Sequence, residues 1–134
     1  TDHETEENFM QYYPGDRYVD MMGADLYGND SKETYIRQVR EEYTVISRVA
    51  AAHHKLMCFA ETGSRNTPDP QWFTTGLWKA IQGFRLSYVL LWRNAWDQPK
   101  ENFGPAPDKS CAADFRVLYS YPTSLFLNDM KTIR

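Results

Sequence analysis

Three short apolar runs, each followed by a longer segment with helical periodicity, constrain the fold of this 134-residue chain more than any other feature. The runs cover residues 18–25, 56–61 and 87–92. Strands that alternate with helices are typical of parallel sheets, because two parallel neighbours need a long crossover between them. Near-continuous apolar strands are expected where helices cover one face of a sheet and a filled interior covers the other. We therefore expect an α/β fold with three parallel strands.

The segment after the first run has the spacing and the end signals of a helix that continues to about residue 52. Asp30 or Ser31 can cap its first turn. Its apolar residues recur at three- and four-residue intervals, which predicts one buried stripe. The stripe consists of Tyr35, Ile36, Val39, Tyr43, Ile46, Val49 and Ala50.

Two further helices are expected, each after a loop. The loop over 62–70 is rich in Gly, Pro, Asn and Asp, and a helical pattern follows it over 71–81. A long loop then leads to a helix over 112–119. The apolar residues 125–127 are expected to dock against the body of the protein.

Polar side chains gather where the three strands end. Asp25 and Glu61 close the first two runs, and Trp92, Arg93 and Asn94 close the third. In parallel folds these ends share one edge of the sheet, which is where barrel enzymes place their chemistry. An open, doubly wound sheet also binds ligands there. The pattern therefore predicts the place of the site and leaves both folds open.

Composition and charge exclude several kinds of partner. A net charge of −3 with scattered basic residues argues against nucleic-acid binding. No stretch approaches the roughly 20 apolar residues that span a bilayer. The cysteines, Cys58 and Cys111, form no ligand motif, and His53 and His54 are adjacent, so we expect no metal site and no cofactor. Aromatic residues make up 15% of the chain, which suits either an aromatic core or a sugar-binding surface.

Glu61 is the sharpest chemical signal. A carboxylate at the tip of a buried strand is rigidly placed and partly desolvated, as catalytic carboxylates are. The simpler reading is a cap for the next segment or an ion pair with Arg65. The neighbouring strands favour the catalytic reading. Asp25 and Tyr27 are two residues apart on one strand, so both side chains face the same side and can reach the site.

The end of the third run offers groups that suit a sugar. The indole of Trp92 can stack on an apolar sugar face, and Arg93 and Asn94 can form hydrogen bonds with hydroxyl groups. The alternative is a core tryptophan followed by a surface arginine.

Together these motifs resemble glycoside hydrolase family 26, whose members are chiefly β-mannanases. The resemblance rests on a Tyr-Pro-Gly-Asp…Tyr-Val-Asp…Gly-x-Asp-x-Tyr stretch over 13–27, a Glu-Thr-Gly strand over 59–63, and a Leu-Leu-Trp-Arg-Asn-Ala strand over 90–95. It covers most of the chain. It implies strands six, seven and eight of a (β/α)8 TIM barrel, so that residues 1–134 form the C-terminal half of a catalytic barrel.

The resemblance also implies a role for each site residue. Glu61 corresponds to the nucleophile, Tyr27 to its hydrogen-bonding partner, and Trp92 to the platform under the cleaved sugar. Asp25 and Arg93 correspond to substrate contacts. The implied reaction is retaining hydrolysis of β-1,4-mannosidic bonds in mannan-type polysaccharides. From the polymeric substrate alone we expect a secreted, cell-surface or periplasmic enzyme. Related β-glucanase and xylanase specificities share these strand motifs.

One element of the family pattern has no counterpart in these residues. The resemblance places the acid/base Glu at the end of strand four, whereas this chain begins near helix five. We therefore expect a fragment of a longer enzyme, inactive alone, whose N-terminal half of the barrel accompanies it. A typical barrel needs about 250 residues. Two alternatives are a non-catalytic carbohydrate-binding fragment and a small flavodoxin-like domain. The second would require a better phosphate loop than residues 27–31 provide.

Overall fold

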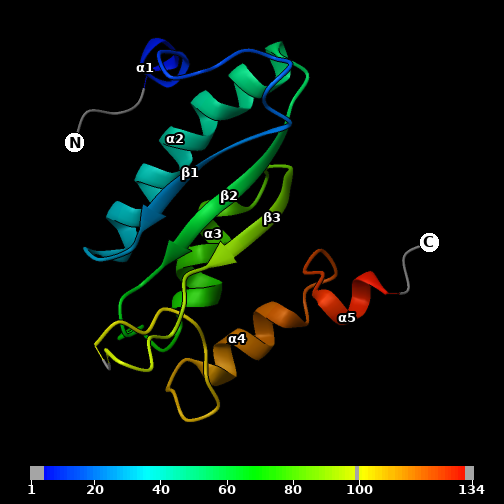
Figure 1. The fold of residues 1–134 in the computed structure, drawn as a ribbon. Coiled ribbons are helices and arrows are strands. Elements are labelled where there is room, and N and C mark those ends of the chain that lie inside the picture. The colour runs from blue at the N-terminus through cyan, green and yellow to red at the C-terminus, as the bar shows by residue number, and fades with distance from the viewer. Residues whose placement is uncertain (1–4, 99, 132–134) are drawn as a thin grey trace.

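Strands and helices alternate along the chain, as the apolar runs predict (Figure 1). The structure is a computed structural model that describes residues 5–98 and 100–131. Its elements are α1 (Glu6–Met10), β1 (Met21–Tyr27), α2 (Lys32–Ala52), β2 (Leu56–Gly63), the π-helical turn η1 (Phe73–Leu77), α3 (Trp78–Ile81), β3 (Leu86–Leu91), α4 (Ala112–Tyr119) and α5 (Leu127–Met130).

The three strands form one parallel sheet in the order β1-β2-β3. Their arrowheads in Figure 1 all point the same way, so the three carboxyl ends share one edge. Helix α2 connects β1 to β2 and packs against both. The expected α/β fold with three parallel strands is confirmed.

Helix α2 supplies the largest part of the core. Ser31 is its cap, since the Ser31 hydroxyl accepts a hydrogen bond of 3.1 Å from the Thr34 amide. The predicted stripe is confirmed, with Ile36 partly buried and the other six residues buried. The Tyr43 hydroxyl donates to the Cys58 carbonyl oxygen of β2 at 2.9 Å. Helix and sheet are therefore joined by a buried hydrogen bond as well as by apolar packing.

The predicted elements differ from the structure mainly at their ends. The first strand begins at Met21 instead of residue 18, because Tyr18 closes a turn through a hydrogen bond from its amide to the Gly15 carbonyl oxygen. Strand β3 ends at Leu91, so Trp92 belongs to the following loop. The helix predicted over 71–81 is present, but part of it is the π-helical turn η1.

The docking predicted for residues 125–127 holds for one side chain only. Phe126 packs against Phe115 and Tyr119, with ring centroids 5.7 and 4.7 Å apart. Leu125 and Leu127 are exposed. The segment therefore contacts α4 through the ring of Phe126. An apolar sequence run did not reveal which of its members would face the protein.

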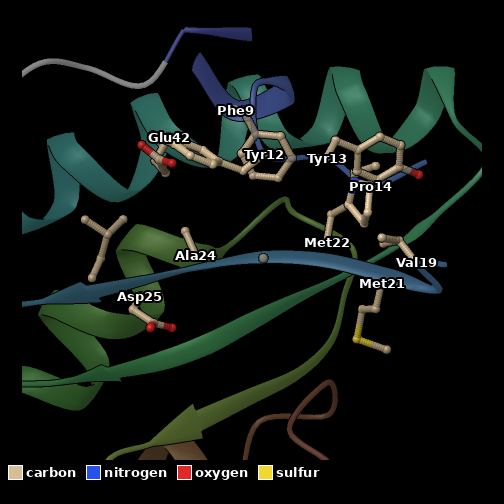
Figure 2. Close-up of a pocket in the computed structure, with 12 residues that line it drawn as sticks. Phe9, Tyr12, Tyr13, Pro14, Val19, Met21, Met22, Ala24, Asp25 and Glu42 are labelled. Atoms are coloured by element: carbon tan, nitrogen blue, oxygen red, sulfur yellow. The ribbon is translucent and has the colours of Figure 1, made fainter. Parts of the chain in front are cut away.

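The two faces of the sheet differ in how well they are covered. Figure 2 shows Met22 and Ala24 on the helix side of β1, with Met21 and Asp25 on the opposite side. On β3, Val89 packs into the core, whereas its neighbours Tyr88 and Leu90 alternate to the other face and are 47% and 41% exposed. This second face, which we call the inner face, therefore presents apolar side chains to solvent. Such a surface favours association with further polypeptide.

Candidate active site at the carboxyl ends of the strands

A β-bulge in β2 determines where Glu61 points. Ala24 of β1 pairs with Phe59, but the next residue, Asp25, pairs with Glu61, so β2 has one extra residue, Ala60. Phe59 is fully buried against Tyr43 of α2. In a regular strand, residues two apart face the same side. The bulge reverses this alternation and turns Glu61 to the inner face. Bulges beside active sites commonly redirect a side chain in this way.

Tyr27 and Glu61 are in direct contact. The Tyr27 hydroxyl donates a hydrogen bond of 2.7 Å to Oε2 of Glu61. Burial, followed by the hydrogen bond and the charge of Glu61, raises the pKa of Tyr27 well above its ordinary value. The hydroxyl therefore stays protonated at neutral pH and remains a donor. The structure thus brings together the two residues that the sequence selected from different strands.

Asp25 lies beside the same carboxylate. It is the register partner of Glu61 on the neighbouring strand, and its side chain lies on the inner face (Figure 2). Burial, followed by the charge of Glu61, raises the pKa of Asp25. Two carboxylates at the end of adjacent strands repel each other when both are ionised. The ionised form of Asp25 therefore lowers the stability of the fold at this edge of the sheet.

We expect Asp25→Asn to stabilise the protein at pH 7 and to leave its stability nearly unchanged at about pH 3, below the ordinary pKa of aspartate. Because the folded-state pKa of Asp25 is raised, the wild type is favoured while Asp25 is protonated and loses stability as the pH rises through that pKa. Asn imitates the protonated acid at every pH. Thermal unfolding of both proteins at the two pH values measures the difference. An equal shift in melting temperature at both would contradict this account.

The three predicted site residues after β3 lie at the same edge of the sheet, where each contacts a neighbouring strand end or loop. They are Trp92, Arg93 and Asn94. The Trp92 amide donates to the Thr62 carbonyl oxygen at 2.8 Å, which places Trp92 beside the end of β2. Arg93 lies 3.9 Å from Asp97, and both side chains are about half exposed. The Asn94 side-chain oxygen accepts a hydrogen bond of 2.9 Å from the Gly104 amide. Asn94 therefore holds the loop through its oxygen, and its amide nitrogen can still donate to a ligand.

Sequence reasoning missed Phe103, which supports the site from the long loop after β3. The Tyr27 and Phe103 rings meet edge to face with centroids 5.3 Å apart, and Phe103 is buried. Gly63 makes this possible, because a Cβ at Gly63 would lie 2.8 Å from the Cβ of Phe103. The glycine of the Glu-Thr-Gly motif was the one local signal of that close approach.

Tyr88 and Thr62 are also absent from the sequence-based site. The neighbouring Cys58 thiol raises the pKa of Tyr88, a residue whose side chain lies on the inner face. Thr62 faces the core, where its hydroxyl and that of Tyr35 form a hydrogen bond of 2.6 Å.

Within residues 5–98 and 100–131, no three His, Cys, Asp or Glu side chains are grouped to hold a metal.

Parallel strands with helices on one face and a carboxylate at their carboxyl ends are the arrangement of barrel enzymes of the α/β class. The sequence model described as Glycosyl hydrolase family 26 matches residues 1–100. The chain belongs to this family.

Solved structures agree with the family. A family 26 β-mannanase from Bacteroides ovatus is 34% identical with a TM-score of 0.91, over 96% of this chain and 37% of that one. An endo-β-1,4-mannanase catalytic domain from a Bacillus species is 25% identical with a TM-score of 0.83, over 96% and 38%. A modular endo-β-1,4-mannanase from Cellulomonas fimi is 27% identical with a TM-score of 0.76, over 90% and 28%.

The chain therefore spans less than half the length of these proteins. The expectation of a partial (β/α)8 barrel is confirmed. The similarity to these enzymes favours the barrel over the doubly wound sheet that the strand pattern also allowed. None of the helices in the described part of the chain is long and apolar enough to cross a membrane.

Proposed function

We propose that this chain carries the nucleophile of a retaining glycoside hydrolase that cleaves β-1,4-mannosidic bonds in mannan-type polysaccharides. The observation that carries the proposal is the 2.7 Å hydrogen bond from Tyr27 to Glu61 at the carboxyl edge of the sheet. It stands in a chain of family 26 whose structural neighbours include β-mannanases. A secreted enzyme is proposed because a polysaccharide of this size is degraded outside the cell.

The proposed reaction has two steps, each at the anomeric carbon of the sugar. Glu61 attacks that carbon, the glycosidic C–O bond breaks, and an acid protonates the departing oxygen. Water then attacks the glycosyl-enzyme ester, with the same acid/base residue taking the proton of the water. Tyr27 orients one oxygen of Glu61 and leaves the other for the attack.

The remaining site residues are proposed to bind the substrate. Trp92 would lie under the sugar whose bond is cleaved, and Arg93 and Asp25 would form hydrogen bonds with hydroxyl groups. Asn94 would donate a hydrogen bond through its amide nitrogen while its oxygen holds the Gly104 amide. The side chains of Arg93 and Asp97 are about half exposed, so Arg93 can exchange Asp97 for a ligand at little cost.

Residues 1–134 are proposed to be the C-terminal half of the catalytic barrel, with the acid/base in the other half. The exposed inner face and the free edges of β1 and β3 suit docking of further strands. Beside β1 lies a cavity of about 570 Å³, lined on one side by Phe9, Tyr12 and Tyr13 and on the other by the strand (Figure 2). Further strands and helices of a closed barrel would cover this edge.

Tyr27→Phe is expected to lower kcat/KM on mannan by roughly 10- to 100-fold, the range expected for the loss of a hydrogen bond to a charged group. The ring and its contact with Phe103 are retained, so the fold is unaffected. Steady-state kinetics of the full-length protein provides the measurement. Tyr119→Phe, which alters an exposed tyrosine on α4, serves as the matched control and should match the wild type. Equal activity of Y27F and the control would remove Tyr27 from the proposed site.

A further inference from the structure

Trp96 is the most exposed large hydrophobic side chain in the described part of the chain, with 92% of its surface open. It lies in the loop after β3, four residues beyond Trp92. Single exposed apolar side chains are common on protein surfaces, so exposure alone has no meaning. Two features of the loop that carries Trp96 indicate a functional role for this side chain.

The backbone that carries Trp96 is held on both sides. Asn94 and Asn102 form an antiparallel bridge, and the Ala95 amide donates to the Glu101 carbonyl oxygen at 3.0 Å. Asn102 in turn accepts a hydrogen bond of 2.6 Å from the Asn66 amide in the loop after β2. Ala95 itself is buried. The indole is therefore presented by a braced loop, which reduces the entropy lost when a ligand binds to it.

The second feature is the position of this loop relative to Glu61. Figure 1 shows the loops after β2 and β3 together beyond the arrowheads of the strands, on the edge where Glu61 lies. Asp97 follows Trp96 directly, and its ion-pair partner Arg93 lies three residues before Trp96; both side chains are about half exposed. An aromatic face next to hydrogen-bonding groups matches a sugar ring, which has apolar C–H faces and peripheral hydroxyls.

We propose that Trp96 stacks against a sugar unit of the polysaccharide that lies beyond the unit held at Glu61. This inference rests on the proposed function and deepens it, because it makes the loop after β3 a determinant of the length of substrate that is bound. Trp96 touches no reacting atom. Its contribution appears only when the substrate is long enough to reach it.

The test compares Trp96→Ala with the wild type on β-1,4-linked manno-oligosaccharides of increasing length, using the full-length protein. Aromatic stacking of about 0.5–1.5 kcal/mol corresponds to a KM raised roughly two- to tenfold on the long substrates. The kcat and the KM for the shortest cleaved substrate should stay at wild-type values. Trp96→Phe should restore most of the affinity. Tyr18→Ala, an exposed aromatic before the amino end of β1, is the matched control and should leave the length dependence unchanged.

Each failure has a distinct outcome. A wild type that cleaves mannan together with a W96A variant that shows the same length dependence would overturn the role of Trp96 alone. An equal loss on short and long substrates, accompanied by a lower melting temperature, would show that Trp96 is covered by other parts of the protein and would also overturn it. A wild type without activity on any of these substrates would overturn the proposed function itself.

Discussion

Replacing Glu61 with Gln is expected to reduce the turnover of mannan by roughly 10⁴- to 10⁶-fold, the range seen when an essential nucleophile is removed. The amide keeps the shape of the side chain and can still accept the hydrogen bond from Tyr27. It cannot form the glycosyl ester on which both steps depend. Release of reducing sugar by the purified full-length protein measures the effect, and binding of manno-oligosaccharide should be largely retained.

The matched control is Glu33→Gln, which removes a carboxylate from the exposed first turn of α2. It changes the net charge as E61Q does, and it should retain wild-type activity. Thermal unfolding of both variants separates a chemical loss from a folding defect. An E61Q protein with more than a tenth of wild-type turnover and an unchanged melting temperature would contradict the nucleophile assignment.

The sequence was sufficient to predict the general place of the site, because the rule involved is geometric. Parallel strands must end at one edge, so Asp25, Tyr27 and Glu61 had to lie near one another once the strands were recognised. The rule that residues two apart face the same side placed Asp25 and Tyr27 together on the inner face. The observed contact between Tyr27 and Glu61 agrees with that reasoning.

The rule that residues two apart face the same side does not hold across Phe59 and Glu61 of β2. Without the bulge at Ala60, Phe59 and Glu61 would face the same side, and the catalytic candidate would point into the core beside Tyr43. A bulge depends on how two strands pair, and nothing in the residues 56–63 marks the extra position. The sequence motif therefore identified Glu61 without explaining how its side chain reaches the site.

Contacts that depend on long loops were also beyond sequence analysis. Phe103 reaches Tyr27 only because the loop after β3 folds back over Gly63. Asn94 was predicted to form hydrogen bonds with substrate hydroxyls, and its side-chain oxygen also closes the same loop onto Gly104. Local patterns describe strands and helices well because neighbouring residues decide them. The partners in these two contacts are 10 or more residues apart, and the only local trace of either contact is the glycine at position 63.

The second large expected effect concerns the acid/base residue that we propose lies in the other half of the barrel. Without that residue, reactivity should depend on whether the leaving group of the substrate needs a proton. The 134-residue chain on its own is expected to leave mannan intact but to react with an aryl mannobioside whose phenol departs without protonation. General acid catalysis contributes about 10²- to 10⁴-fold, and the aryl substrate avoids that requirement. Deglycosylation requires the same residue as a base, so the glycosyl ester should accumulate.

Mass spectrometry of the intact chain measures this directly as an added mannobiosyl group, and peptide mapping should locate it on Glu61. The E61Q chain is the control and should remain unlabelled. Addition of the other half of the barrel should release the label and restore hydrolysis of mannan. If the chain binds manno-oligosaccharide but takes up no label, then it acts as a carbohydrate-binding fragment instead. If the chain alone hydrolyses mannan as fast as the full-length protein, then the acid lies within these 134 residues and the division of the catalytic pair between two halves is wrong.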